Sequence, residues 1–126
     1  MSSLAKVGFV ELAAGGVSGW VIVLSLERPE ALERAGVRVP RRLLQAHLDL
    51  ILMGLILIAT GLALPDLTAA IAVPLAFGTW VNPLLFVPLA FAPGFDKRLP
   101  YRALSVVSFA CVSGGLIAVA VEALRA

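Results

Sequence analysis

The sequence predicts an all-α integral membrane protein, a four-helix bundle in one domain spanning residues 1–126, and three observations lead to that prediction. Of the 126 residues, 60% are hydrophobic and only 14% are charged, whereas about a quarter of a soluble domain is charged. The mean hydropathy is +1.00. The apolar residues form four runs of membrane-spanning length. The expected partner is therefore the lipid bilayer, and a net charge of only +2 gives no reason to expect a nucleic-acid partner.

The first expected span covers residues 7–26, about twenty residues, which suffices to cross ~30 Å of hydrocarbon. It contains several glycines, which let helices approach closely in lipid. It also contains Glu11. A carboxyl group inside a span usually faces the bundle interior or a water-filled cavity. Because Glu11 lies near one end of this span, its side chain could equally extend to the interface.

The second expected span covers residues 43–64 and follows a hydrophilic connection, residues 27–42. Pro29 can begin a short surface helix in that connection, and Gly36 can end it. Within the span, Asp49 is expected to extend to the lipid headgroups. Pro65 stops the helix.

His47, the only histidine, lies one turn inside the second span. Neutral imidazole is the commonest metal ligand among side chains, so His47 is either an interfacial residue or an axial ligand to haem iron. Gly54 lies two turns further along the same face. It could leave room for a flat macrocycle, or it could mark a helix crossing. The residues by themselves leave both questions open.

The third expected span covers residues 67–92 and contains three prolines, so it should be kinked or broken. Its centre, FGTWVNP, places Trp80 and Asn82 at mid-membrane depth. A buried asparagine needs hydrogen-bond partners, either at the kink or in a pocket. The fourth expected span covers residues 103–124, where small residues indicate helix packing.

The distribution of basic residues predicts the orientation. Residues 27–42 and 93–102 contain eight of the ten Lys and Arg residues. The positive-inside rule therefore predicts that both connections are cytoplasmic and both termini external. The expected location is a bacterial inner (plasma) membrane.

Two motifs, AHLDLILMGLILIATGLALP and GTWVNP, resemble those of the small four-helix membrane isomerases that include styrene oxide isomerase and hydroxylaminobenzene mutase. The resemblance implies a homotrimer that binds haem b near subunit interfaces, with His47 as axial ligand and with Gly54 and Trp80 beside the cofactor. It also implies redox-neutral isomerisation of a small apolar substrate, such as an aryl epoxide, with ferric iron as Lewis acid.

The sequence departs from the family at two candidate catalytic positions. Met53 stands where the family has an asparagine, and Phe86 stands where it has a tyrosine, while Asn82 is retained. Neither methionine nor phenylalanine donates a hydrogen bond. The Phe86 ring could still stabilise a cation, and Met53 could form a pocket wall or a weak sulfur ligand.

Two other functions compete with the isomerase. One is a non-catalytic haem-binding membrane protein, which the loss of two polar residues favours. The other is a small multidrug-type transporter that uses Glu11 for proton-coupled exchange. Such a transporter would need the Glu11 carboxyl in a central cavity.

Overall fold

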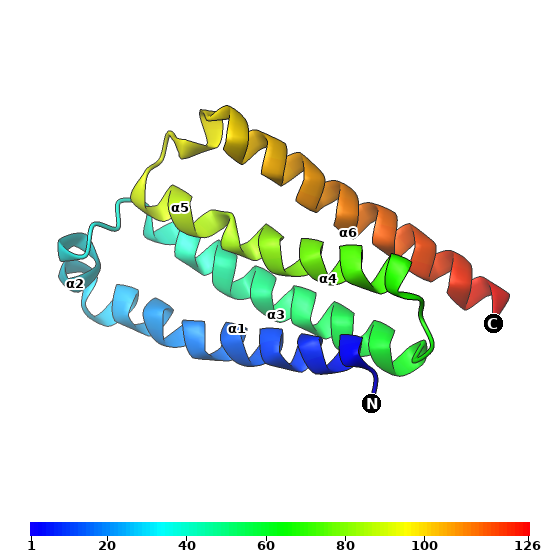
Figure 1. Ribbon diagram of the computed structural model, residues 1–126. Helices are drawn as coiled ribbons and strands as arrows, with labels where there is room; N and C mark the ends of the chain where they lie inside the picture. The colour runs from blue at the N-terminus through cyan, green and yellow to red at the C-terminus, as the bar shows by residue number, and fades with distance from the viewer.

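The computed structural model describes residues 1–126, which form helices and turns without strands. The elements are α1 (Ser3–Glu27), α2 (Pro29–Arg34), α3 (Pro40–Ala63), α4 (Ala69–Leu84), α5 (Phe86–Phe91), η1 (Phe95–Lys97) and α6 (Leu99–Arg125) (Figure 1). Four helical units, with α4 and α5 counted as one, are long and apolar enough to cross a membrane. The prediction of an all-α membrane protein with four spans is confirmed.

Three of the four spans, α1, α3 and α6, begin earlier than the hydropathy pattern predicts, because polar and proline residues form their first turns. The Ser2 hydroxyl accepts a hydrogen bond from the Ala5 backbone N–H and caps α1. Pro40 occupies the first turn of α3, where a missing N–H costs nothing. The short helix after α1 forms as predicted, and Gly36 follows it with a φ of +94°, which suits glycine.

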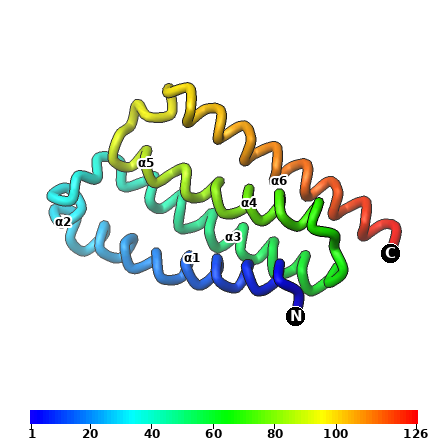
Figure 2. The backbone as a smooth tube through the Cα atoms, viewed as in Figure 1, coloured from blue at the N-terminus to red at the C-terminus, as the bar shows by residue number.

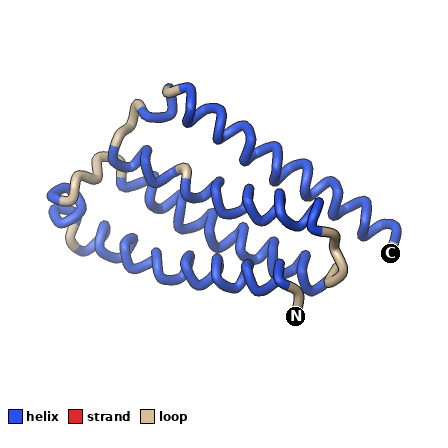
Figure 3. The backbone as a smooth tube through the Cα atoms, viewed as in Figure 1, coloured by secondary structure: helices blue, strands red, loops and turns tan.

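The third span is broken at Leu85, which separates α4 from α5 and is visible as a short loop segment in Figure 3. Pro83 and Pro88 flank the break, and proline removes a helical N–H donor and crowds the preceding turn. The Leu85 carbonyl accepts a 2.6 Å hydrogen bond from the Tyr101 hydroxyl of α6. The predicted kink is confirmed, and the Tyr101 side chain of the next helix gives the Leu85 carbonyl at the break a hydrogen-bond donor.

The helices pack in chain order: α1 lies along α3, α3 contacts α4, and α6 packs against α4 (Figure 2). Leu4, Leu57 and Leu75, from α1, α3 and α4, form a buried cluster against which Trp80 packs. Helix α6 diverges from α5 toward the end where η1 lies (Figure 1). The last span therefore depends mainly on α4 for its position.

Close packing of α1 on α3 depends on glycine. A Cβ atom built at Gly54 would lie 2.8 Å from the Leu12 nitrogen, and one at Gly8 would lie 2.8 Å from the Ile58 nitrogen. Real Cβ atoms do not approach backbone this closely, so the two helices meet at these residues. Of the two interpretations of Gly54, the structure shows the helix crossing. The face of Gly54 is covered by α1 and leaves no space there for a macrocycle.

The two ends of the bundle differ in charge. Both termini and the α3–α4 turn lie at one end, and α2 and η1 lie at the other (Figure 1). The basic residues near α2 and η1 are Arg28, Arg34, Arg38, Arg41, Arg42, Lys97, Arg98 and Arg102. The segment after α2 is fixed to α5, because the Ala90 carbonyl accepts hydrogen bonds from the N–H groups of Arg38 and Val39.

Candidate functional site

The His47 ring lies at the seam between α1 and α3. Its Nδ1 atom lies 2.7 Å from the Gly15 carbonyl oxygen and 2.9 Å from the Ser18 hydroxyl oxygen. A Cβ atom at Gly19 would lie 3.1 Å from the ring carbon Cε1. The small residues of α1 that the sequence suggested for helix packing therefore also form the surface on which the ring rests.

These contacts determine which ring nitrogen is free. The Gly15 carbonyl can only accept hydrogen bonds. The Ser18 hydroxyl donates a hydrogen bond of 2.7 Å to that same carbonyl oxygen. A neutral His47 therefore carries its proton on Nδ1 and donates it to Gly15. The other nitrogen, Nε2, keeps its lone pair and has no hydrogen-bond partner in the chain. This is the arrangement in which a histidine typically binds a metal, with a backbone carbonyl orienting the ring.

A second feature is a cavity of about 750 Å³ between the α4–α5 unit and α6, hereafter the lateral cavity. It lies near the end of the bundle where these helices diverge. Ten residues line it: Asp49, Asn82, Leu85, Phe86, Tyr101, Ser105, Val106, Phe109, Ala110 and Ser113. Two of the residues predicted from the sequence, Asn82 and Phe86, are thus brought together here.

Asn82 both forms a structural hydrogen bond near the kink and lines a pocket, the two possibilities that the sequence left open. Its amide oxygen lies 2.9 Å from the Ser108 hydroxyl, which also lies 3.2 Å from the Gly78 carbonyl. This bond joins α4 to α6 one turn before the break. The Asn82 side chain also lines the lateral cavity, so its orientation there is fixed by Ser108.

Asp49 also lines the lateral cavity, which the sequence did not predict. The sequence suggested that its side chain reaches the lipid headgroups, but it lines the lateral cavity and is half-buried. Asp49 is nine residues after Pro40, or about 14 Å along the helix axis from its start. At that position, α3 directs Asp49 toward α4 and α6 rather than toward the end of the bundle.

His47 and the lateral cavity lie on different sides of α3. Residues two positions apart on a helix point about 160° away from one another, so His47 faces α1 while Asp49 faces the cavity. Trp80 packs against the buried leucine cluster, and neither Trp80 nor Met53 lines the cavity. Within one chain, the structure therefore brings together Asn82 and Phe86 but not His47, Met53 or Trp80.

Glu11 is completely buried, and neither of its carboxyl oxygens has a hydrogen-bond partner. The idea that its side chain extends to the interface is wrong, because α1 begins at Ser3 and places Glu11 more than two turns inside the helix. The polar side chains that act on it are Thr79, also fully buried, and Asp49. Glu11 does not line the lateral cavity.

Burial without a partner makes Glu11 costly for folding, since an unsatisfied buried polar group costs about 1–3 kcal/mol. We expect Glu11→Leu, which has a similar volume and no polar atoms, to raise the Tm in detergent by about 3 °C or more. The control is Glu122→Leu, because the Glu122 side chain on α6 is 43% exposed. A lower Tm for Glu11→Leu alone would show that the carboxyl group has a stabilising partner.

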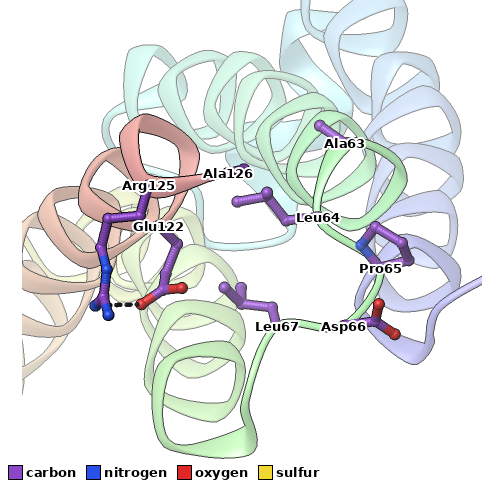
Figure 4. Close-up of a pocket in the computed structure, with 8 residues that line it drawn as sticks. All are labelled: Ala63, Leu64, Pro65, Asp66, Leu67, Glu122, Arg125 and Ala126. Atoms are coloured by element: carbon purple, nitrogen blue, oxygen red, sulfur yellow. Dashed lines mark ion pairs between the residues drawn. The ribbon is translucent and has the colours of Figure 1, made fainter.

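The pocket at the opposite end of the bundle carries no comparable chemistry. It has a volume of about 340 Å³ and lies between the α3–α4 turn and the end of α6 (Figure 4). Its charged groups are Asp66 and the pair Glu122–Arg125, whose side chains lie 3.5 Å apart. An exposed ion pair of this kind contributes little to stability.

The chain has no match among protein-family models, curated proteins or solved structures. No group of three or more His, Cys, Asp or Glu side chains is positioned to hold a bare metal ion. The two candidate sites are thus His47 with its free Nε2 atom and the lateral cavity, and their interpretation depends on their own geometry.

Proposed function

We propose that the protein binds haem b in a membrane, with His47 Nε2 as axial ligand, and isomerises a small apolar substrate such as an aryl epoxide without net redox change. The observation that carries the proposal is the 2.7 Å contact between His47 Nδ1 and the Gly15 carbonyl. It fixes the tautomer, so that the lone pair needed for ligation lies on the unpartnered nitrogen. The family resemblance of the second and third spans supports the same assignment.

His47 fits a haem iron better than a bare ion. A haem supplies four equatorial nitrogens itself and needs only one or two side chains, whereas a zinc site needs three or four protein ligands. The chain offers one histidine, and no cluster of other ligands accompanies it. When bound, ferric haem would supply a Lewis acid that withdraws electron density from a substrate oxygen.

The lateral cavity supplies the groups that would hold the substrate. The Asn82 amide, held by Ser108, can hydrogen-bond to a substrate oxygen. The Phe86 ring can stabilise positive charge that develops on a benzylic carbon, through its negative face. The six hydrophobic residues among the ten of the lining limit the access of water, which would otherwise capture such a cation.

A homotrimer would bring the two sites together. In one chain, His47 and the lateral cavity lie on different sides of α3, so a site using both needs a second copy. Contact between two different surfaces of identical chains is heterologous, and it closes into a ring rather than a twofold dimer. The apolar residues exposed on α6 include Val106, Val107 and Phe109, and they provide a surface for such contact or for lipid.

The proposed orientation places the α2 and η1 end in the cytoplasm of a bacterial inner membrane. The eight basic residues at that end support this orientation through the positive-inside rule. His47 then lies nearer the cytoplasmic face. A non-catalytic haem protein is the second candidate, and the apolar side chains of Met53 and Phe86 favour it because they cannot hydrogen-bond to a substrate.

The first experiment is an absorption spectrum of the detergent-purified protein, recorded as isolated, after titration with hemin, and after reduction with dithionite. We expect a Soret band that saturates at one haem per chain, with a shift on reduction. The isolated haem protein is then assayed with styrene oxide, and aldehyde formation distinguishes the isomerase from the non-catalytic candidate. A protein that stays colourless with excess hemin would exclude both.

A further inference from the structure

The lateral cavity contains a carboxylate that no basic side chain of the chain neutralises. We propose that this cavity binds a primary aralkylammonium ion, with Asp49 as its counter-ion. The proposal is carried by the position of Asp49 in a cavity of about 750 Å³ that also contains aromatic rings and hydrogen-bond acceptors. Cavities of roughly 300–1,000 Å³ are usual for small ligands.

Asp49 has no ionic partner in the chain. A carboxylate about 14 Å inside a membrane-spanning helix needs a partner, because charge is costly in a low-dielectric region. The only ion pair in the structure joins Glu122 and Arg125 at the far end. Arg42 donates a hydrogen bond to the Gln45 side chain and is not part of the cavity lining. A cationic ligand would supply the missing positive charge.

Glu11 strengthens the preference for a cation. Its carboxyl group is fully buried on α1, lies within reach of Thr79 and Asp49, and has no basic side chain beside it. The interior of the bundle therefore offers a cation two carboxyl groups, of which only Asp49 opens into the cavity. An anion would meet repulsion from an ionised Asp49.

The remaining lining selects an aromatic ammonium ion over a hydrated metal ion. Phe86 and Phe109, from α5 and α6, are large apolar side chains of the lining. Their rings can pack on an arene and attract a cation. The Ser105 hydroxyl oxygen can accept from the ammonium N–H groups, and the Asn82 amide oxygen, which accepts one hydrogen bond from Ser108, has a second lone pair for them. The cavity lies between membrane-spanning helices, so an amphipathic amine can enter from the bilayer.

This inference needs neither His47 nor a haem, although it concerns the same cavity that the proposed function assigns to the substrate. It assigns a ligand to the lateral cavity, whereas the haem assignment depends on the seam between α1 and α3. The same titration on wild-type protein and on His47→Ala separates the two. We expect equal amine affinity in both, and failure to bind hemin would leave the amine result unchanged.

The test is equilibrium binding of radiolabelled 2-phenylethylammonium to the protein in lipid nanodiscs at pH 7, with empty nanodiscs subtracted. The neutral analogue is 2-phenylethanol, which has the same ring and chain length. We expect saturable binding of the ammonium ion and at least tenfold weaker binding of the alcohol. Because this comparison uses wild-type protein, it does not depend on whether any variant folds. Equal affinities, or no saturable binding of either, would overturn the proposal.

The matched variants are Asp49→Asn and Asp66→Asn. Asp66 is exposed in the α3–α4 turn at the opposite end of the bundle (Figure 4). We expect Asp49→Asn to lose at least tenfold in affinity for the ammonium ion while Asp66→Asn keeps wild-type affinity. Both variants are checked by size-exclusion chromatography. Unchanged binding in a folded Asp49→Asn protein would overturn the assignment of the counter-ion.

Discussion

His47→Ala is expected to reduce haem content by more than tenfold while leaving the four-span fold intact. The ring is held by Gly15 and Ser18 at the seam of α1 and α3, and it is not part of the buried leucine cluster. Its removal therefore takes away the iron ligand at a small cost in packing. The measurement is the ratio of Soret to protein absorbance after hemin titration and gel filtration.

Two controls make that result specific. Ser18→Ala removes the hydroxyl beside Nδ1 but keeps the Gly15 carbonyl, so it should retain haem. Exogenous imidazole should restore a Soret band to His47→Ala by replacing the missing ligand. A His47→Ala protein that holds haem at the wild-type ratio would refute the axial assignment.

Gly54→Ala is expected to destabilise the protein by about 1–3 kcal/mol, the usual cost of forcing an extra carbon into a packed interior. The new methyl group would lie 2.8 Å from the Leu12 nitrogen and 3.1 Å from the Leu12 Cα atom, both on the backbone of α1. Backbone cannot rotate away as a flexible side chain can, so α1 and α3 must separate. Thermal unfolding in detergent, followed by circular dichroism, measures the change.

Gly114→Ala is the matched control on α6. A Cβ atom built at Gly114 meets nothing within 4 Å. Alanine is also the better helix former, by about 1 kcal/mol in a helix interior. The same substitution should therefore lower stability at residue 54 and leave it equal or higher at residue 114. Equal stability of Gly54→Ala and wild type would contradict the close approach of the two helices.

The sequence by itself determined the fold class, the number of spans and the break in the third span. These properties follow from local chemistry: apolar runs of membrane length must be helical in lipid, and proline must interrupt helical hydrogen bonding. It also singled out His47, because a lone histidine in an apolar helix is visible without a structure. Asn82 was likewise identified as a buried amide that needs a partner.

Only the tertiary structure decided what surrounds these residues. It showed that the Gly15 carbonyl holds His47 Nδ1, that α1 covers Gly54, and that Asp49 lines a cavity. Each result depends on which face of one helix meets which face of another. Hydropathy and spacing give the faces of each helix but not their partners. Residues far apart in the chain, such as Glu11 and Thr79, therefore become neighbours only through packing.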